Sequence, residues 1–220
     1  VVAAFEKVGG EAVAEGVARG LLGNALVMQG LLHSLLDRAR MRMVPAQYTA
    51  YLKEAYLTLP VVKAEELGAR FRDTSGIPGF LYWRKFCAES PQLDIGNLMA
   101  TISTTPINAE VERAYRAPFP DQEYLAGARR FPSLVPVFRD EPEVEENTAA
   151  WEVLRRFDKP FMLAFSDNDP VTAGGDKKFL AEVPGAQGVK HRTITNAGHF
   201  LQEDQPAQCV QAILDITGRA

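Results

Sequence analysis

Two short polar segments contain residue types that could do acid–base chemistry. Ser166–Pro170 contains Asp167 and Asp169, and Asn196–Phe200 contains His199. A carboxylate that accepts a hydrogen bond from one ring nitrogen of a histidine fixes the tautomer of the imidazole and stabilises the imidazolium. The other ring nitrogen is then free to act as a general base. The segments therefore predict a pair formed by His199 and one of the two aspartates.

Each of these residues also has a structural reading. Both aspartates could cap the helix that follows them, since Asp-Asn-Asp-Pro is favourable turn chemistry. His199 could be a hydrogen-bonded structural histidine, and His191, in the middle of a predicted strand, is expected to be one. Gly198 should let the backbone turn sharply and leave the imidazole beside it unobstructed.

Two predicted strands must place the polar segments at one edge of a sheet. Phe161–Phe165 is a continuous apolar run, typical of a buried parallel strand, and Val189–Thr195 is rich in β-branched residues. Helices are expected over Thr148–Phe157, over Asp176–Val183 and from about Gln205 onward. Because reactive groups collect beyond the carboxyl ends of parallel strands, the two segments should face one crevice. The predicted fold class is α/β, with an incomplete sheet.

The remainder of the chain is predicted to be helical. Residues 1–75 form a helical segment without an assigned role, and residues 76–147, rich in proline and aromatic side chains, predict the short helices of a lid. Residues 148–220 then form the C-terminal part of the α/β core. The last helix should end at Gly218 and bury one face, made of Val210, Ile213, Leu214 and Thr217.

The composition argues against several classes of function. A formal net charge of −4 does not suit nucleic-acid binding, which needs a concentrated basic surface. Cys87 and Cys209 give neither a disulfide framework nor metal-ligand spacing. We therefore expect reduced thiols in a cytoplasmic protein without metal or cofactor. The most apolar stretch, Leu21–Leu36, contains polar residues and is shorter than the ~20 residues of a membrane span, so we expect a soluble protein.

Four motifs in this order resemble the haloalkane dehalogenases of the α/β-hydrolase superfamily. They are Gly79–Phe86, Arg113–Asp121 with Tyr124 and Gly127–Pro132, Phe165–Pro170, and Ala197–Glu203. The resemblance covers residues 76–216 and implies that Asp169, which directly precedes a proline, is the acid and that His199 activates water. It also implies that the indole N–H of Trp83 in the lid binds the departing halide, with simple packing as the alternative role. The implied substrates are small apolar haloalkanes.

The nucleophile motif of that family is absent from the sequence. No Asp-Trp-Gly-Gly elbow, no Gly-x-Ser-x-Gly and no His-Gly-x-Pro loop occurs. Without a first carboxylate there is no alkyl ester for His199 to resolve. Two alternatives therefore stay open: another α/β-hydrolase activity, such as ester or epoxide hydrolysis, and a non-catalytic relative that binds a partner or an apolar ligand. Because a two-stranded sheet exposes its edges, self-association through the incomplete sheet is also expected.

Overall fold

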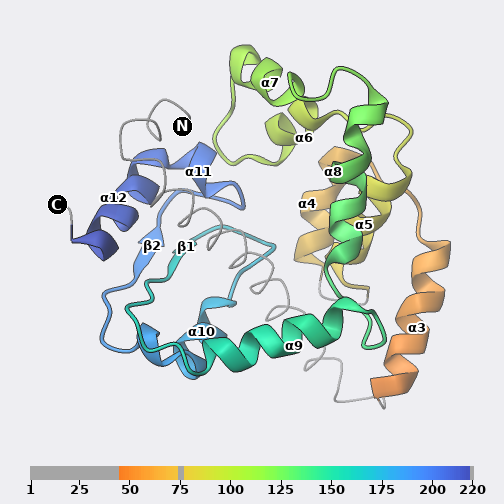
Figure 1. The fold of residues 1–220 in the computed structure, drawn as a ribbon. Coiled ribbons are helices and arrows are strands. Elements are labelled where there is room, and N and C mark those ends of the chain that lie inside the picture. The colour runs from red at the N-terminus through yellow and green to blue at the C-terminus, as the bar shows by residue number, and fades with distance from the viewer. Residues whose placement is uncertain (1–44, 74–76, 219–220) are drawn as a thin grey trace.

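The computed structural model describes residues 45–73 and 77–218, so predictions for residues 1–44 lie outside the described residues. The described chain has a helical part and a smaller α/β part with two strands, and one long helix, Glu143–Leu154, runs from the first part to the second (Figure 1). None of the described helices has the length and apolar character needed to cross a membrane.

The helical part begins with α3 (Pro45–Thr58) and α4 (Ala64–Arg72), so the described portion of the predicted segment 1–75 is largely helical. The predicted lid, residues 76–147, consists of the expected short helices. Their bounds, with η for 3-10 helices, are α5 (Gly79–Glu89), α6 (Ile95–Ile102), α7 (Ala109–Arg116), η1 (Gln122–Leu125), α8 (Ala126–Arg130) and η2 (Phe131–Leu134). Asp94 and Asn108 cap α6 and α7 by accepting hydrogen bonds from backbone N–H groups of the first turn.

An apolar core holds α4, α5 and α6 together. It includes Leu67 of α4, Phe86 of α5 and Leu98 of α6, and burial of each such side chain stabilises the fold by roughly 1.5–3 kcal/mol. Trp83 packs at the border of this core and of a second one that contains Phe80. The packing therefore fixes the face of α5 on which Trp83 lies.

The α/β part contains the two strands in parallel. Strand β1 pairs with β2 in the register Ala164↔Arg192, Phe165↔Thr193 and Ser166↔Ile194. The bounds of its elements are α9 (Glu143–Leu154), β1 (Ala164–Ser166), α10 (Asp176–Glu182), η3 (Pro184–Ala186), β2 (Arg192–Ile194), α11 (Leu201–Asp204) and α12 (Pro206–Thr217). A core centred on Trp151, Leu163 and Phe179 joins α9 and α10 to β1.

The strands are shorter than predicted. Strand β1 begins at Ala164 instead of Phe161, because the Phe161 N–H donates to Gly185 O (2.8 Å) and the Leu163 N–H donates to His191 Nδ1 (3.1 Å). These bonds use backbone donors that a longer ladder would need. His191 is therefore structural, as predicted, and its Nε2 also bonds Ala186 O (3.0 Å).

Two helix predictions need correction. Helix α9 begins at Glu143 instead of Thr148, since Pro142 precedes it and its first turn is acidic, which suits the positive end of the helix dipole. The predicted buried face of α12 is wrong: Val210 and Ile213 are 46% and 50% exposed, and Thr217 is exposed too. Ala212 is the buried residue of this helix, because a described sheet of two strands offers little surface for a wider face.

Candidate active site

The predicted acid and histidine lie in contact beyond the carboxyl ends of β1 and β2. His199 Nδ1 is 3.0 Å from Asp169 Oδ2. Since a carboxylate only accepts hydrogen bonds, Nδ1 carries a proton, and in the neutral imidazole Nε2 therefore has the lone pair. Asp169 is 5% exposed, whereas the imidazole keeps 37% of its surface accessible. The geometry is that of a buried acid that orients a reachable base.

Asp169 does not cap the following helix, α10, whose N-cap is Gly175, but its carboxylate holds the turn directly after β1. Oδ1 accepts the backbone N–H of Val171 (2.7 Å), and Oδ2 accepts the hydroxyl of Thr172. Burial alone would raise the pKa of Asp169, but the hydrogen bond from His199, with those from Thr172 and Val171, holds this pKa below its usual value. The carboxylate is therefore ionised at neutral pH, as stabilisation of an imidazolium requires.

Asp167, the rival acid, does not contact His199. Its carboxylate accepts the backbone N–H groups of Asn196 (2.9 Å) and Ala197 (3.2 Å), and these bonds lower its pKa. The neighbouring Asn168 N–H donates to Ala197 O (3.1 Å). Asp167 thus joins the loop that carries Asp169 to the loop that carries His199 through hydrogen bonds to the backbone.

Gly198 is needed for space and not for a turn. Its φ is outside the left-handed region, contrary to the expected role in a sharp turn. A Cβ at this position would collide with Thr104 Oγ1 of the lid. The lid therefore lies directly against the backbone that precedes His199.

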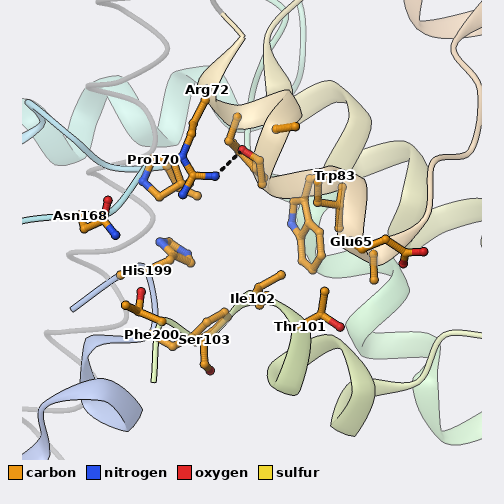
Figure 2. Close-up of a pocket in the computed structure, with 18 of the residues that line it drawn as sticks. Glu65, Arg72, Trp83, Thr101, Ile102, Ser103, Asn168, Pro170, His199 and Phe200 are labelled. Atoms are coloured by element: carbon orange, nitrogen blue, oxygen red, sulfur yellow. Dashed lines mark hydrogen bonds between the residues drawn. The ribbon is translucent and has the colours of Figure 1, made fainter. Parts of the chain in front are cut away.

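A cavity of about 870 Å³ lies between the helical part, including α4, and the loop that carries His199. Figure 2 shows His199 on one side of it and Trp83 on the other, with Ile102, Ser103 and Phe200 along its floor. The indole N–H of Trp83 donates no hydrogen bond to any residue that the structure describes. The cavity therefore brings together an imidazole and an indole in a largely apolar wall.

Arg72 of α4 and Ser103 also line the cavity, and neither residue was predicted from the sequence. The guanidinium donates to Gly68 O of its own helix (3.0 Å; Figure 2). Ser103 Oγ is buried without a hydrogen-bond partner in the described part of the chain. Their positions depend on how α4 and α6 pack, which no local motif encodes.

Other predicted residues lie away from this cavity. Cys87 and Cys209 are free thiols, and burial raises the pKa of Cys87 to about 12, which keeps it protonated and unreactive. Within residues 45–73 and 77–218, no cluster of His, Cys, Asp or Glu has a geometry that could hold a metal ion.

Comparison with known sequences identifies relatives that are named haloalkane dehalogenase. The haloalkane dehalogenase of Psychrobacter cryohalolentis is 50% identical over 127 residues, which are 58% of this chain and 42% of that protein. The matched part of this chain is related to the haloalkane dehalogenases. The haloalkane dehalogenase of Mycobacterium marinum is 42% identical over 135 residues, or 61% of this chain and 45% of that protein. The chain thus spans less than half the length of these haloalkane dehalogenases, and no family model matches it.

Solved haloalkane dehalogenase structures share the fold. DatA from Agrobacterium tumefaciens superposes with a TM-score of 0.51 at 21% identity, covering 70% of this chain and 50% of that one. DbeA from Bradyrhizobium elkani gives the same TM-score and identity over the same shares of the two chains. The described residues therefore have part of the α/β-hydrolase fold, mostly helical and with a short parallel sheet of two strands.

Proposed function

We propose that this chain is a hydrolase of the haloalkane dehalogenase type, which cleaves the carbon–halogen bond of small haloalkanes through an ester intermediate. The observation that carries the proposal is the 3.0 Å contact between His199 Nδ1 and Asp169 Oδ2 at the wall of the cavity that Trp83 also lines. The sequence relatives named haloalkane dehalogenase support the reaction class.

The residues of this site suit the second half of such a reaction. His199 Nε2 would take a proton from water as the water attacks the ester carbonyl, and Asp169 would stabilise the resulting imidazolium. The acyl–oxygen bond then breaks as the imidazolium returns its proton to the departing oxygen, and the alcohol leaves with the oxygen that had attacked the alkyl carbon. In the first half, a carboxylate displaces halide from that carbon. We do not assign this carboxylate to a residue, because the family's elbow motif is absent.

Trp83 is proposed to bind the departing halide. Its indole N–H faces a cavity whose walls are largely apolar, and a halide binds best where donors meet little competition from water.

Halide release from bromobutane tests the activity. Wild-type chain should release bromide over many turnovers, whereas His199→Ala should release at most one bromide per chain and retain the alkyl group as a mass adduct. If His199→Ala released no bromide and carried no alkyl adduct, His199 would be needed for ester formation itself, and its proposed role in ester hydrolysis would be rejected. No release from the wild-type chain would reject the activity itself.

A non-catalytic relative that binds an apolar ligand is the second candidate. The absence of the family's elbow motif from this sequence favours it. Bromobutane or bromide binding without any halide release by the wild-type chain would support it over the hydrolase.

Three further expectations stay proposals. The lid is proposed to span residues 76–147 and the core residues 148–220, although α9 crosses that boundary. A cytoplasmic location would suit the two free thiols.

Self-association through the edges of the two-stranded sheet should appear as a concentration-dependent mass in sedimentation equilibrium, and a constant monomer mass would reject it.

A further inference from the structure

A buried carboxylate joins the lid to the histidine loop. Asp204, the last residue of α11, is 6% exposed. Its Oδ2 accepts the backbone N–H of Gly198 (2.8 Å), and its Oδ1 accepts the backbone N–H of Thr105 (2.6 Å). One side chain therefore bonds the residue before His199 and a lid residue 99 positions away in sequence.

This carboxylate depends on those two bonds. No lysine or arginine in the described part of the chain forms an ion pair with Asp204. A buried carboxylate whose oxygens lack hydrogen-bond partners is strongly unfavourable, so loss of either backbone donor would destabilise this arrangement. The carboxylate thereby restrains both segments at once.

Two further contacts join the predicted lid to the segment around His199. Thr104 lies so close to Gly198 that a side chain there would collide with it. One residue before Asp204, Glu203 Oε1 accepts the hydroxyl of Tyr115 from α7 (2.5 Å). Short contacts thus surround the backbone that places the imidazole.

We propose that Asp204 is a positioning residue, which holds the His199 loop against the lid so that the imidazole keeps both its contact with Asp169 and its access to the cavity. The proposal rests on the proposed function in naming His199 as the base. Its test nevertheless needs no turnover, so the two can fail separately.

Asp204→Asn is the sharpest variant, because it keeps the size of the side chain. An amide has one acceptor oxygen, and its NH₂ group would face a backbone N–H that also donates. At least one of the two bonds is then lost, and exchange of the Gly198 or Thr105 amide hydrogen should accelerate about tenfold or more.

The tautomer of His199, read from its imidazole nitrogen-15 shifts, distinguishes positioning from simple stability. Wild-type chain should hold the Nδ1-protonated form, which the Asp169 contact requires. Asp204→Asn should shift the ring toward a mixture with the Nε2-protonated form. Glu203→Gln, which keeps an acceptor for Tyr115, should leave the tautomer unchanged.

Asp94→Ala serves as the stability control. It removes the cap of α6 and should lower the melting temperature without changing the His199 tautomer. The proposal is overturned if Asp204→Asn keeps the wild-type tautomer and the wild-type amide exchange, or if Asp94→Ala shifts the tautomer as much as Asp204→Asn does.

Discussion

At the scale of single residues, Asp169 performs two tasks. It holds the turn after β1 through Val171 and Thr172, and it accepts the Nδ1 proton of His199. The turn bonds and the contact with His199 are therefore compatible in one carboxylate, whereas the expected capping of the following helix is wrong, because Gly175 is the N-cap of α10. The turn bonds hold the carboxylate in place, and a carboxylate held in place can orient the imidazole.

The lowered pKa of Asp169 predicts a pH dependence of stability. A carboxyl whose pKa is lower in the folded state than the value of about 3.9 when unfolded stabilises the fold above that value and stops doing so as pH falls through the folded pKa. Asp169→Asn should lower the free energy of unfolding at neutral pH by about 1–3 kcal/mol. Its urea-unfolding free energy should also fall less than that of wild type between about pH 5 and pH 2.

The exposed Asp158→Asn variant is the matched control for this measurement. It should keep the wild-type pH dependence. Equal slopes in the Asp158 and Asp169 variants would show that the Asp169 hydrogen bonds do not contribute to acid stability.

Trp83 predicts a spectroscopic response to halide. The chain has two tryptophans, and Trp151 is buried in the core beneath α9, so bromide should reach only Trp83. Bromide should quench the fluorescence of the wild-type chain with saturation, and Trp83→Phe should abolish the saturable part. Quenching that rises linearly in both proteins would mean random collision and would remove the halide-site assignment.

At the scale of elements, the close approach of the lid to the histidine loop explains Gly198. Gly198→Ala should destabilise the chain by about 1–3 kcal/mol, because the added methyl collides with Thr104 Oγ1. Thr104→Ala removes that atom, so the double variant should recover part of the loss in thermal unfolding. Additive losses in the double variant would contradict this explanation.

The acid–histidine pair could be predicted because its information is local. Each residue lies in a short polar segment directly after a strand, and parallel strands bring such segments together. The predicted start of β1 was wrong because the true start depends on residues far away in sequence. His191 and Gly185 accept the backbone hydrogen bonds of Leu163 and Phe161. Asp204 could not be found in this way, since its function depends on Thr105, far away in sequence.

At the scale of the whole molecule, the described residues form a helical part and a smaller part with a two-stranded sheet. The described sheet has two parallel strands, fewer than the three or more that give a sheet independent stability. Packing of α9 and α10 against β1 compensates in part, through Trp151, Leu163 and Phe179. The outer face of α12, with Ile213, stays open.

Because this face of α12 is exposed, the fold should tolerate a charged side chain there. Ile213→Lys should change the free energy of unfolding by no more than about 0.5 kcal/mol, because the side chain is half exposed. Ala212→Lys, at the buried position beside it, should cost about 2 kcal/mol or more. Equal losses in urea unfolding would mean that the face of α12 is covered in solution.

The central claim is that water activated by His199 hydrolyses an ester formed on this chain. A single turnover of bromobutane in oxygen-18 water tests it most directly, with mass spectrometry of the alcohol and of the peptides. The account predicts unlabelled alcohol and one oxygen-18 in a carboxylate of the wild-type chain, with no label in His199→Ala. Labelled alcohol with an unlabelled chain would mean direct attack of water on carbon and would contradict the account.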